Sequence, residues 1–339
     1  MRAAVLPRRG GPEVFEIQDR PEPPLGPGRL RIRVRAAGVN FADLMARQGL
    51  YPDAPDLPAV LGYEVAGEVE QVGERVEAYA PGDRVMAATR FGGYAESVSV
   101  SERDVLALPE GWSFEEGAAC PVVYGTAYAS LVSFGNVRAG ERVLIQAAAG
   151  GVGIAATQIA KLLGAEIYGT ASGAKHAAIR ELGVQHPIDY RATDFADEVR
   201  RIAGEDAPLD LIVDGIGAAS WKRGYELLRP GGRLVMIGAS SFVTGEKRNL
   251  AKAAANLARV PRFNPIRMSS ESRAVIGLNM LRLWDARGSL DEWIEPLAQW
   301  LDQGLLRPVV SQTFPLERVA DAHRFIGERR NIGKVVLTV

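Results

Sequence analysis

The sequence is poor in cysteine and histidine. It contains one cysteine, Cys120, and three histidines, His176, His186 and His323, in 339 residues. A single cysteine excludes a disulfide within the chain, which fits a reducing compartment. These four residues cannot supply a cysteine-rich zinc site. Cys120 precedes Pro121 in an apolar run, so we expect a buried small residue rather than a nucleophile.

An excess of charge of one sign and long apolar segments are also absent. Lys and Arg total 40 against 41 for Asp and Glu, a net charge of −1. This balance argues against a nucleic-acid partner, which usually requires a basic face, and against a general attraction to anionic membranes. No apolar run reaches 18 residues and the N-terminus lacks one of signal-peptide length. We therefore expect a cytoplasmic protein without stable membrane insertion.

The chain has two regions of different pattern, and its 339 residues favour two domains. Up to about residue 115, alternating segments such as Arg29–Ala37 and Glu64–Val72 are separated by Gly and Pro turns, typical of a barrel-like, partly open sheet. Beyond it, apolar strands from Arg142–Ala147 to Arg233–Gly238 alternate with helical segments. This order predicts an α/β fold with a doubly wound parallel sheet, covered by helices on both faces.

The last part of the chain returns to mixed character. Residues 290–303 and 315–326 have helical patterns, and Lys334–Val339 reads as a terminal strand. In the simplest architecture, this C-terminal segment packs back on the N-terminal β domain.

A glycine-rich turn follows the first strand of the predicted parallel sheet. Ala148, Gly150 and Gly153 have the spacing of a dinucleotide fingerprint, with Ala148 in place of the usual first glycine. Gly150 would let a pyrophosphate approach the backbone, and Gly153 would let the helix pack tightly on the strand. The helix N-terminus offers free N–H groups and a positive dipole end. A turn that serves packing alone is disfavoured, because the motif lies between a strand and a helix in a series of βαβ units.

The end of the second strand bears on the choice between NAD and NADP. An acidic residue about 20 positions past the glycines would bind the ribose 2′-hydroxyl of NAD. Residues 169–176 contain no Asp or Glu, but they contain Ser172 and Lys175. A hydroxyl and a cation suit a 2′-phosphate. Lys175 can equally be a solvated helix lysine, but the missing acid and the present cation together favour NADPH.

These features resemble a known family. Residues 140–161, with Gln158 and Lys161 after the glycine turn, look like the signature of the zinc-independent quinone oxidoreductase and zeta-crystallin family of medium-chain dehydrogenases/reductases. Segments 38–51, 169–190 and 244–250 closely resemble the vesicle amine transport protein 1 group of that family, and the similarity runs from residue 5 to residue 339. The resemblance implies a GroES-like catalytic domain, a Rossmann domain and a homodimer.

The resemblance also suggests domain boundaries. Residues 1–120 would form the first part of the GroES-like domain, and residues 121–265 the Rossmann NADPH-binding domain. Residues 266–339 would complete the Rossmann sheet and then return to the catalytic domain.

Both catalytic zinc ligands of the wider superfamily are replaced. Zinc enzymes carry Cys after a Gly-Val pair and later Gly-His-Glu, where this chain has Gly38-Val39-Asn40 and Gly62-Tyr63-Glu64. The four-cysteine structural lobe is absent as well. The resemblance therefore implies no metal and no Lewis acid. Alcohol dehydrogenation is not expected, whereas hydride delivery to a quinone or enone, which is already electrophilic, remains feasible.

The positions that match the family's NADPH contacts are spread along the chain. Asn40 and Thr126 would lie near the nicotinamide, and Gly150, Gly151 and Val152 would line the pyrophosphate. Ser172, Lys175 and Tyr190 would hold the 2′-phosphate and adenosine. The ribose and nicotinamide would be bordered by Gly215, Ile216, Ile237 and Gly238, and the cofactor would be closed over by Asn331 and Lys334. Plainer roles stay open: a helix N-cap for Asn40, a strand end for Tyr190, a backbone partner for Thr126 and a turn for Gly238.

Quinone reduction depends mainly on proximity and orientation, so no strong acid–base pair is expected. The candidates for orienting the substrate oxygen are Asn40, Asp43, Tyr51 and Tyr63. Our hypothesis is that Tyr51 or Tyr63 donates a hydrogen bond to a developing enolate or hydroquinone oxygen; the alternative is that both pack the wall of the site. Asp43 and Arg47 are four residues apart on a predicted helix, which favours a structural salt bridge.

Two functions from different classes fit the sequence. The first is an NADPH-dependent reductase of a small-molecule quinone or enone. The second is an NADPH-binding protein with little catalysis, acting as a lipid- or membrane-associated adaptor. Residues 244–264 carry five Lys or Arg among Ala, Leu and Val. A basic amphipathic helix can lie on an anionic membrane, but a solvated helix is the more common outcome and the one we expect.

Overall fold

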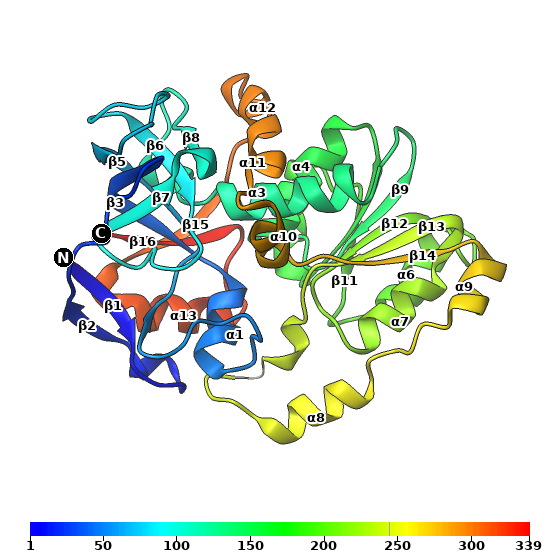
Figure 1. Cartoon of the computed structure of the whole chain (residues 1–339). Coiled ribbons are helices and arrows are strands. Elements are labelled where there is room, and N and C mark those ends of the chain that lie inside the picture. Colours follow the sequence, from blue (N-terminus) through cyan, green and yellow to red (C-terminus); the bar gives the residue numbers. More distant parts are fainter. Residues whose placement is uncertain (244) are drawn as a thin grey trace. The chain divides into compact units, whose positions relative to one another are not determined.

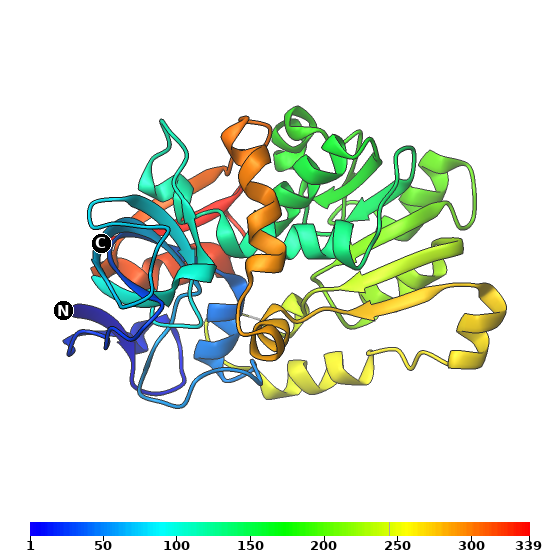
Figure 2. The same cartoon turned by 45° about the horizontal axis from the view of Figure 1, so that its top comes forward.

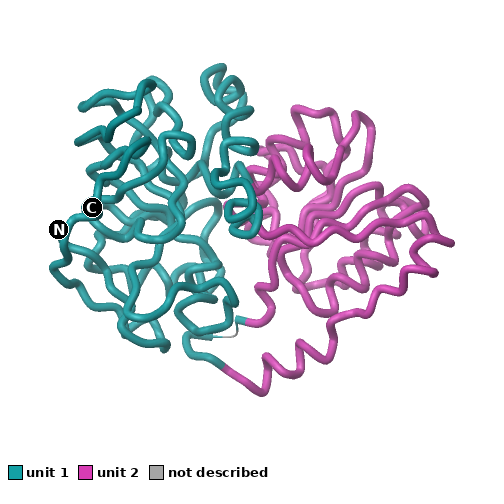
Figure 3. Tube along the Cα trace, viewed as in Figure 1, with its two compact units in different colours: residues 1–125, 243–248, 280–339 teal, residues 126–242, 249–279 magenta. Residues whose placement is uncertain are grey.

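The computed structural model describes residues 1–243 and 245–339 and divides them into two compact units. Unit 1 comprises residues 1–125, 243–248 and 280–339, and unit 2 comprises residues 126–242 and 249–279 (Figure 3). Thr244, the first residue of two segments singled out above, lies outside the described residues.

Unit 1 is built on a seven-stranded sheet and a three-stranded sheet (Figure 1). The larger sheet has the order β15-β16-β3-β5-β6-β8, and β7 also pairs with β3. Its strands are β3 (Arg29–Val39), β5 (Glu64–Val72), β6 (Arg84–Ala88), β7 (Ser97–Ser101), β8 (Val105–Ala107), β15 (Val310–Pro315) and β16 (Lys334–Thr338). The smaller sheet has the order β2-β1-β4, with β1 (Arg2–Leu6), β2 (Glu16–Asp19) and β4 (Ala59–Val60).

The alternation of apolar and polar residues in β3 buries one face of the strand and exposes the other, as the sequence predicts. Leu30, Ile32 and Val34 are buried in the core of unit 1, whereas Arg33 and Arg35 are exposed. Alternate residues of a strand point to opposite faces, so this pattern fixes which face of the sheet is covered.

The terminal strand packs on the N-terminal β domain, as the sequence predicts. β16 pairs antiparallel with β3, with Val335 opposite Val39 and Leu337 opposite Ala37, and it pairs parallel with β15. The C-terminal strand thus joins the larger sheet formed by β3 and its neighbours.

Helices complete unit 1. They are α1 (Phe41–Gln48), α2 (Phe114–Gly117), α10 (Met280–Arg287), α11 (Asp291–Ile294), α12 (Ala298–Asp302) and α13 (Val319–Gly327), and α3 (Pro121–Tyr128) begins in unit 1 and continues into unit 2. The continuous helix expected over residues 290–303 is wrong. A 3₁₀ turn over Glu295–Leu297 separates α11 from α12, because Pro296 has no N–H to donate to the preceding turn.

Unit 2 holds a six-stranded parallel sheet of order β11-β10-β9-β12-β13-β14. The strands are β9 (Arg142–Ile145), β10 (Glu166–Ala171), β11 (His186–Asp189), β12 (Leu209–Asp214), β13 (Leu228–Met236) and β14 (Ala274–Gly277). Counted in chain order this is 3-2-1-4-5-6, the dinucleotide-binding topology. Figure 1 shows α4 (Gly151–Leu162) on one face of the sheet, and α6 (Phe195–Ala203) and α7 (Ala219–Glu226) on the other. The predicted fold class is confirmed.

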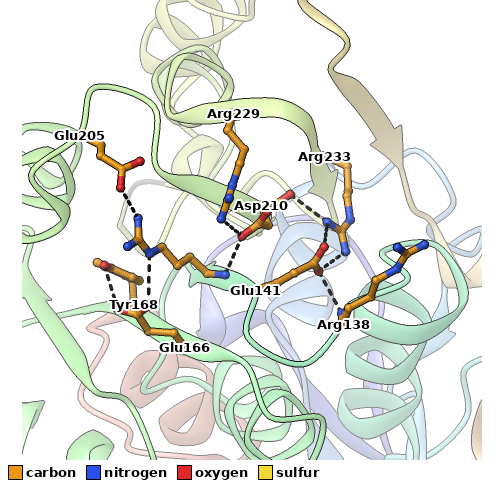
Figure 4. Close-up of polar contacts among 9 residues, drawn as sticks. Arg138, Glu141, Glu166, Tyr168, Glu205, Asp210, Arg229 and Arg233 are labelled. Carbon is orange, nitrogen blue, oxygen red and sulfur yellow. Dashed lines mark hydrogen bonds and ion pairs between the residues drawn. The ribbon is translucent and has the colours of Figure 1, made fainter.

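A network of ion pairs joins the amino ends of these strands (Figure 4). Arg233 donates to both carboxylate oxygens of Glu141, at 2.9 and 2.6 Å, and these side chains are only 12% and 19% exposed. Arg142 pairs with Glu166 and Glu205, and its backbone N–H donates to Asp210. A two-oxygen contact with limited exposure is stronger than an ordinary surface pair. These ion pairs therefore connect the amino ends of the strands, at the end of the sheet opposite the glycine-rich turn.

The segment before β14 contains two short helices, α8 (Leu250–Ala258) and α9 (Pro265–Glu271), joined by residues 259–264 (Figure 2). None of the helices formed by the described residues combines the length and apolarity needed to cross a bilayer.

Candidate functional site

The glycine-rich turn of unit 2 has the shape that the sequence predicts. β9 ends at Ile145, two residues earlier than expected, and Ala147 has a φ of 54° before α4 begins at Gly151. A Cβ on Gly153 would lie 2.3 Å from the Ala147 carbonyl oxygen. Only glycine lets the first turn of the helix approach the strand end this closely.

Gly150 occupies the N-cap position of the twelve-residue helix α4. A Cβ on Gly150 would meet one atom within 4 Å, the Ala147 carbonyl oxygen at 3.3 Å. The backbone is therefore open on this side. The N–H groups of the first turn, which include those of Gly151 and Val152, have no partner four residues earlier. These residues fit a pyrophosphate, which takes N–H donors and a positive helix end.

A buried chain of hydrogen bonds runs along the carboxyl ends of β10, β9 and β12. The Thr170 hydroxyl accepts from the Ala147 N–H (3.0 Å) and donates to Gln146 Oε1 (2.6 Å). Gln146 Nε2 contacts Ser220 Oγ (3.3 Å), which donates to Asp214 Oδ2 (2.6 Å). Sequence reasoning missed these four side chains, because 23 to 74 residues separate the partners in every bond except that of Ser220 to Asp214, which are six residues apart. The one local signal was Asp214, an acid that closes an apolar strand.

Asp214 shapes the loop after β12. Its Oδ1 accepts from the N–H groups of Ile216 (2.7 Å) and Gly217 (3.1 Å). Burial raises the pKa of this carboxyl, while the bonds from Ser220 and the two N–H groups act in the opposite direction. The same loop is bonded to the loop after β13, since the Ser240 N–H donates to the Gly215 carbonyl at 3.0 Å.

The structure brings four of the predicted cofactor residues together there. A Cβ on Gly215 would lie 3.5 Å from Ile237, and one on Gly238 would lie 3.5 Å from the Gly215 carbonyl. Ile216 lies between Gly215 and Gly217, and the Gly217 N–H donates to Asp214. The four residues therefore follow the carboxyl ends of the adjacent strands β12 and β13.

The predicted 2′-phosphate residues lie at the ends of β10 and β11. Ser172 precedes a 3₁₀ turn over Gly173–Lys175, and Tyr190 follows β11 with 39% of its surface exposed. Arg191 lies over the Tyr190 ring at 5.9 Å and adds a cation that sequence reasoning did not include.

An acid also lies at this end of the sheet. Asp189 ends β11 opposite Ala171 of β10, so it reaches the turn from the neighbouring strand rather than from the stretch inspected in the sequence. Its carboxylate accepts from the N–H groups of Arg191 and Gly173, both at 2.9 Å. Backbone hydrogen bonds, that of Arg191 first, lower the pKa of Asp189.

Unit 1 contributes a second cluster, centred on Asn40. Asn40 precedes α1 at the N-cap position, as one of the open alternatives expects. Its side chain, however, is bonded elsewhere: Nδ2 donates to Glu64 Oε1 (3.0 Å), and Oδ1 accepts from Lys334 Nζ (2.5 Å). Lys334 also forms an ion pair with Glu64, and these two side chains are 4% and 0% exposed. Asn331 donates to the Gly333 carbonyl at 2.7 Å.

The expected salt bridge between Asp43 and Arg47 is wrong. The Asp43 carboxylate accepts from the N–H groups of Asn40 (2.8 Å) and Gly62 (3.1 Å), so it caps α1 and holds the Gly62 loop. Arg47 instead donates to the carbonyls of Gly10 and Glu246. Both side chains are buried, and their hydrogen bonds go to backbone groups rather than to each other.

The two candidate tyrosines differ in exposure. Tyr63 is 4% exposed, its ring lies 5.0 Å from that of Phe91, and no hydrogen-bond partner for its hydroxyl exists among the described residues. Tyr51 is partly exposed, and burial, followed by Asp53 and Asp43, raises its pKa to about 12.

Thr126 is buried in α3, and Cys120 is fully buried as expected.

The residues at the zinc position of related enzymes do not fit a zinc ion. By the resemblance, Asn40 and Tyr63 replace a thiolate and an imidazole. An amide and a phenol are poor zinc ligands, and the Lys334 ammonium contacts Asn40 and Glu64. Over residues 1–243 and 245–339, no group of three or more His, Cys, Asp or Glu could hold a metal.

Comparison with known proteins identifies the family. Residues 26–110 match the alcohol dehydrogenase GroES-like domain, and residues 182–337 match the zinc-binding dehydrogenase family. The chain belongs to the medium-chain dehydrogenase/reductase family. Within it, the chain groups with the human synaptic vesicle membrane protein VAT-1 homolog, to which it is 41% identical over 340 residues, covering 99% of this chain and 86% of that protein.

Three solved structures with the same fold bear on the cofactor and substrate. A mycobacterial protein complexed with NADPH has a TM-score of 0.86 and 30% identity, with 100% of both chains covered. An NAD-dependent alcohol dehydrogenase has a TM-score of 0.84 and 33% identity, again with 100% of both chains covered. The quinone oxidoreductase of Coxiella burnetii has a TM-score of 0.80 and 28% identity, covering 100% of this chain and 99% of that one.

The capping role of Asp43 predicts a pH-dependent effect of Asp43→Asn. Burial raises the pKa of Asp43 from 3.8 to about 6, so between these values the folded chain binds a proton that the unfolded chain has released. Wild-type stability therefore falls as pH rises through this window. Asn places a donor against one of the two N–H groups, which costs about 2–3 kcal/mol at pH 4.5. We expect the difference to shrink by about 2 kcal/mol at pH 7.

Urea unfolding of both proteins at pH 4.5 and pH 7 measures this effect. Asp302→Asn, at an exposed position, is the matched control and should show no such pH dependence. A destabilisation by Asp43→Asn that is equal at both pH values would contradict the raised pKa.

Proposed function

We propose that the chain is an NADPH-dependent oxidoreductase that transfers hydride to a quinone or an α,β-unsaturated carbonyl compound without zinc. The observation that carries the proposal is the open backbone at Gly150, at the start of α4 and beside the loops that Thr170 and Asp214 hold. The NADPH complex of the mycobacterial relative and the Coxiella quinone oxidoreductase support this choice of cofactor and acceptor.

In this proposal unit 2 binds the nucleotide. Gly150, Gly151 and Val152 hold the pyrophosphate, and the loops of Gly215–Ile216 and Ile237–Gly238 border the ribose and nicotinamide, near Thr126. Ser172, Lys175 and Tyr190 hold the adenosine and its 2′-phosphate, with Arg191 as a further cation. NADPH supplies the hydride, and the residues of this chain bind and orient it.

Unit 1 orients the reacting groups. Asn40 acts at the nicotinamide end, and Asn331 and Lys334 close over the cofactor. Tyr51 donates a hydrogen bond to the substrate oxygen as negative charge develops there. The raised pKa of Tyr51 keeps its proton in place at neutral pH. Tyr63 is the weaker candidate, because its hydroxyl is buried beside Phe91. Since Asn40 and Tyr63 would replace the zinc ligands of related enzymes, the proposed reaction uses no activated alkoxide and takes acceptors that are already electrophilic. The proposed enzyme acts as a cytoplasmic homodimer.

The cofactor preference is tested by titrating the protein with NADPH and NADH. Wild type should bind NADPH more tightly. Lys175→Ala and Arg191→Ala should each weaken NADPH binding about tenfold, the effect of one lost charge-assisted hydrogen bond, and leave NADH within about twofold. Lys161→Ala, at an exposed position in the last turn of α4, should change neither. Failure to bind either nucleotide would rule out the proposed function.

The acceptor is tested by following NADPH oxidation at 340 nm with a panel of quinones and enones. Tyr51→Phe should lower kcat by about two- to tenfold, the effect of one hydrogen bond, with KM for NADPH unchanged. Tyr63→Phe is the matched control and should stay within about twofold. Unchanged turnover in the double variant would remove the tyrosine hypothesis, and NADPH binding without turnover of any acceptor would favour the second candidate function.

That second candidate, a lipid- or membrane-associated adaptor, is favoured by one segment, residues 245–271. Leu250, Leu257 and Ile266 are 62%, 66% and 81% exposed, more than the other large hydrophobic residues that the structure describes. Residues 245–271 also carry six Lys or Arg against two Glu in a chain of net charge −1. Basic side chains beside exposed apolar ones suit an anionic bilayer surface.

Co-sedimentation with vesicles separates the two candidates. An adaptor should pellet with vesicles of phosphatidylcholine and phosphatidylserine and remain in the supernatant with phosphatidylcholine alone. The Leu250→Ser/Leu257→Ser/Ile266→Ser variant should lose this binding, whereas Ile17→Ser, at a 38% exposed position of unit 1, should keep it. A wild type that ignores both vesicle types rules the adaptor out.

A further inference from the structure

Glu64 is a fully buried acid that has no direct role in the proposed hydride transfer. Each of its oxygens is bonded: Oε1 accepts from Asn40 Nδ2 at 3.0 Å and pairs with Lys334, and Oε2 accepts from the Val122 N–H at 2.9 Å. A buried carboxylate is tolerated only when it is paired and hydrogen-bonded in this way.

The contacts of Glu64 close a ring with Asn40 and Lys334. The Lys334 ammonium donates to Asn40 Oδ1 at 2.5 Å while it also contacts Glu64. The two ends of the Asn40 amide are therefore held by opposite charges, the nitrogen by a carboxylate and the oxygen by an ammonium. Rotation of the amide by 180° would turn its NH₂ toward the ammonium and its oxygen toward the carboxylate. Only one orientation satisfies both partners.

The carboxylate that sets this orientation is fixed by the backbone. A Cβ on Gly38 would lie 2.7 Å from Glu64 Cγ and 2.8 Å from its Oε1, so β3 leaves room for this side chain only because residue 38 is glycine. The Val122 N–H belongs to the first turn of α3 and anchors the other oxygen. Glu64 thus has one position from which it can act on Asn40.

We propose that Glu64 is a positioning residue, which fixes the Asn40 carboxamide so that its second N–H is presented to the nicotinamide end of the cofactor. This inference rests on the proposed function. Asn40 is partly exposed, whereas Glu64 and Lys334 are buried. With one N–H bound to Glu64 and Oδ1 bound to Lys334, the remaining Nδ2–H is the group that Asn40 has left to donate.

Replacement of Glu64 by Gln removes the charge and keeps the shape. The Gln amide turns its NH₂ either toward the Val122 N–H or toward Asn40 and Lys334, so one donor faces another in both cases. The preference for a single orientation of Asn40 is then weakened, because Lys334 alone still holds Oδ1 while the carboxylate that held Nδ2 is gone. Glu64→Asp keeps the charge but shortens the side chain by one methylene, and it should retain part of the orientation.

The experiment is a double-mutant cycle of Glu64→Gln and Asn40→Ala, read from binding to the full-length protein. The two probes are NADPH and 2′-phospho-adenosine diphosphoribose, which lacks the nicotinamide. Glu64→Gln should weaken NADPH binding about tenfold and leave the fragment within about twofold. The double variant should bind NADPH no more weakly than Asn40→Ala alone, because Glu64 acts through Asn40. Glu64→Asp should fall between wild type and Glu64→Gln.

Three outcomes would overturn the inference: equal loss of NADPH and fragment binding, which indicates a structural role; additive losses in the double variant; and unchanged NADPH binding by Glu64→Gln. Because the cycle is read from binding, it is decided independently of acceptor turnover. A wild type that binds no NADPH counts against the proposed function itself, whereas a binding wild type matched by Glu64→Gln counts against Glu64 alone.

Discussion

In unit 1 the register of the terminal strand depends on one buried ion pair, between the Lys334 ammonium and the Glu64 carboxylate. A buried charge without a partner is strongly destabilising, and removal of one member of a buried pair costs about 3–5 kcal/mol. Lys334 begins the terminal strand, while its partners Asn40 and Glu64 lie at the end of β3 and the start of β5. The pair therefore joins segments from both ends of the chain. A slip of β16 by one residue would move the ammonium to the other face of the sheet and leave Glu64 unpaired, so the ion pair specifies the register that opposes Val335 to Val39.

Carboxylates at the two ends of the parallel strands in unit 2 are stabilised in different ways. At the amino ends, arginines such as Arg142 and Arg233 neutralise carboxylates in ion pairs. At the carboxyl ends, Asp214 is bound by a hydroxyl and by the N–H groups of its own loop. Backbone donors hold the loop and still leave the first turn of α4 open to an anion.

The fold could largely be predicted from local pattern, because its elements are defined by periodicity and glycine. The alternation of β3, the order of βαβ units and the close approach at Gly153 each follow from neighbouring residues. The candidate site was harder to predict from the sequence, because the residues that hydrogen-bond to one another there are far apart along the chain. The spacing of Asp43 and Arg47 favoured a salt bridge, but the acid found N–H donors at Asn40 and Gly62, and the arginine found the carbonyl of Glu246, 199 residues away. Local spacing cannot show which buried group a distant backbone segment will satisfy first.

The same limitation applies to the choice of nucleotide. The stretch after β10 lacks an acid, yet the parallel register brings Asp189 of β11 beside it. An acid that selects NAD must offer free oxygens to the ribose hydroxyls. Those of Asp189 accept instead from the N–H groups of Gly173 and Arg191, which lower its pKa and fix it as part of the turn. Arg191 adds a cation next to this carboxylate, and Lys175 ends the 3₁₀ turn whose first residue, Gly173, donates to it. A 2′-phosphate carries more negative charge than a hydroxyl and would be attracted by these cations, so the presence of Asp189 does not argue against the proposed preference for NADPH.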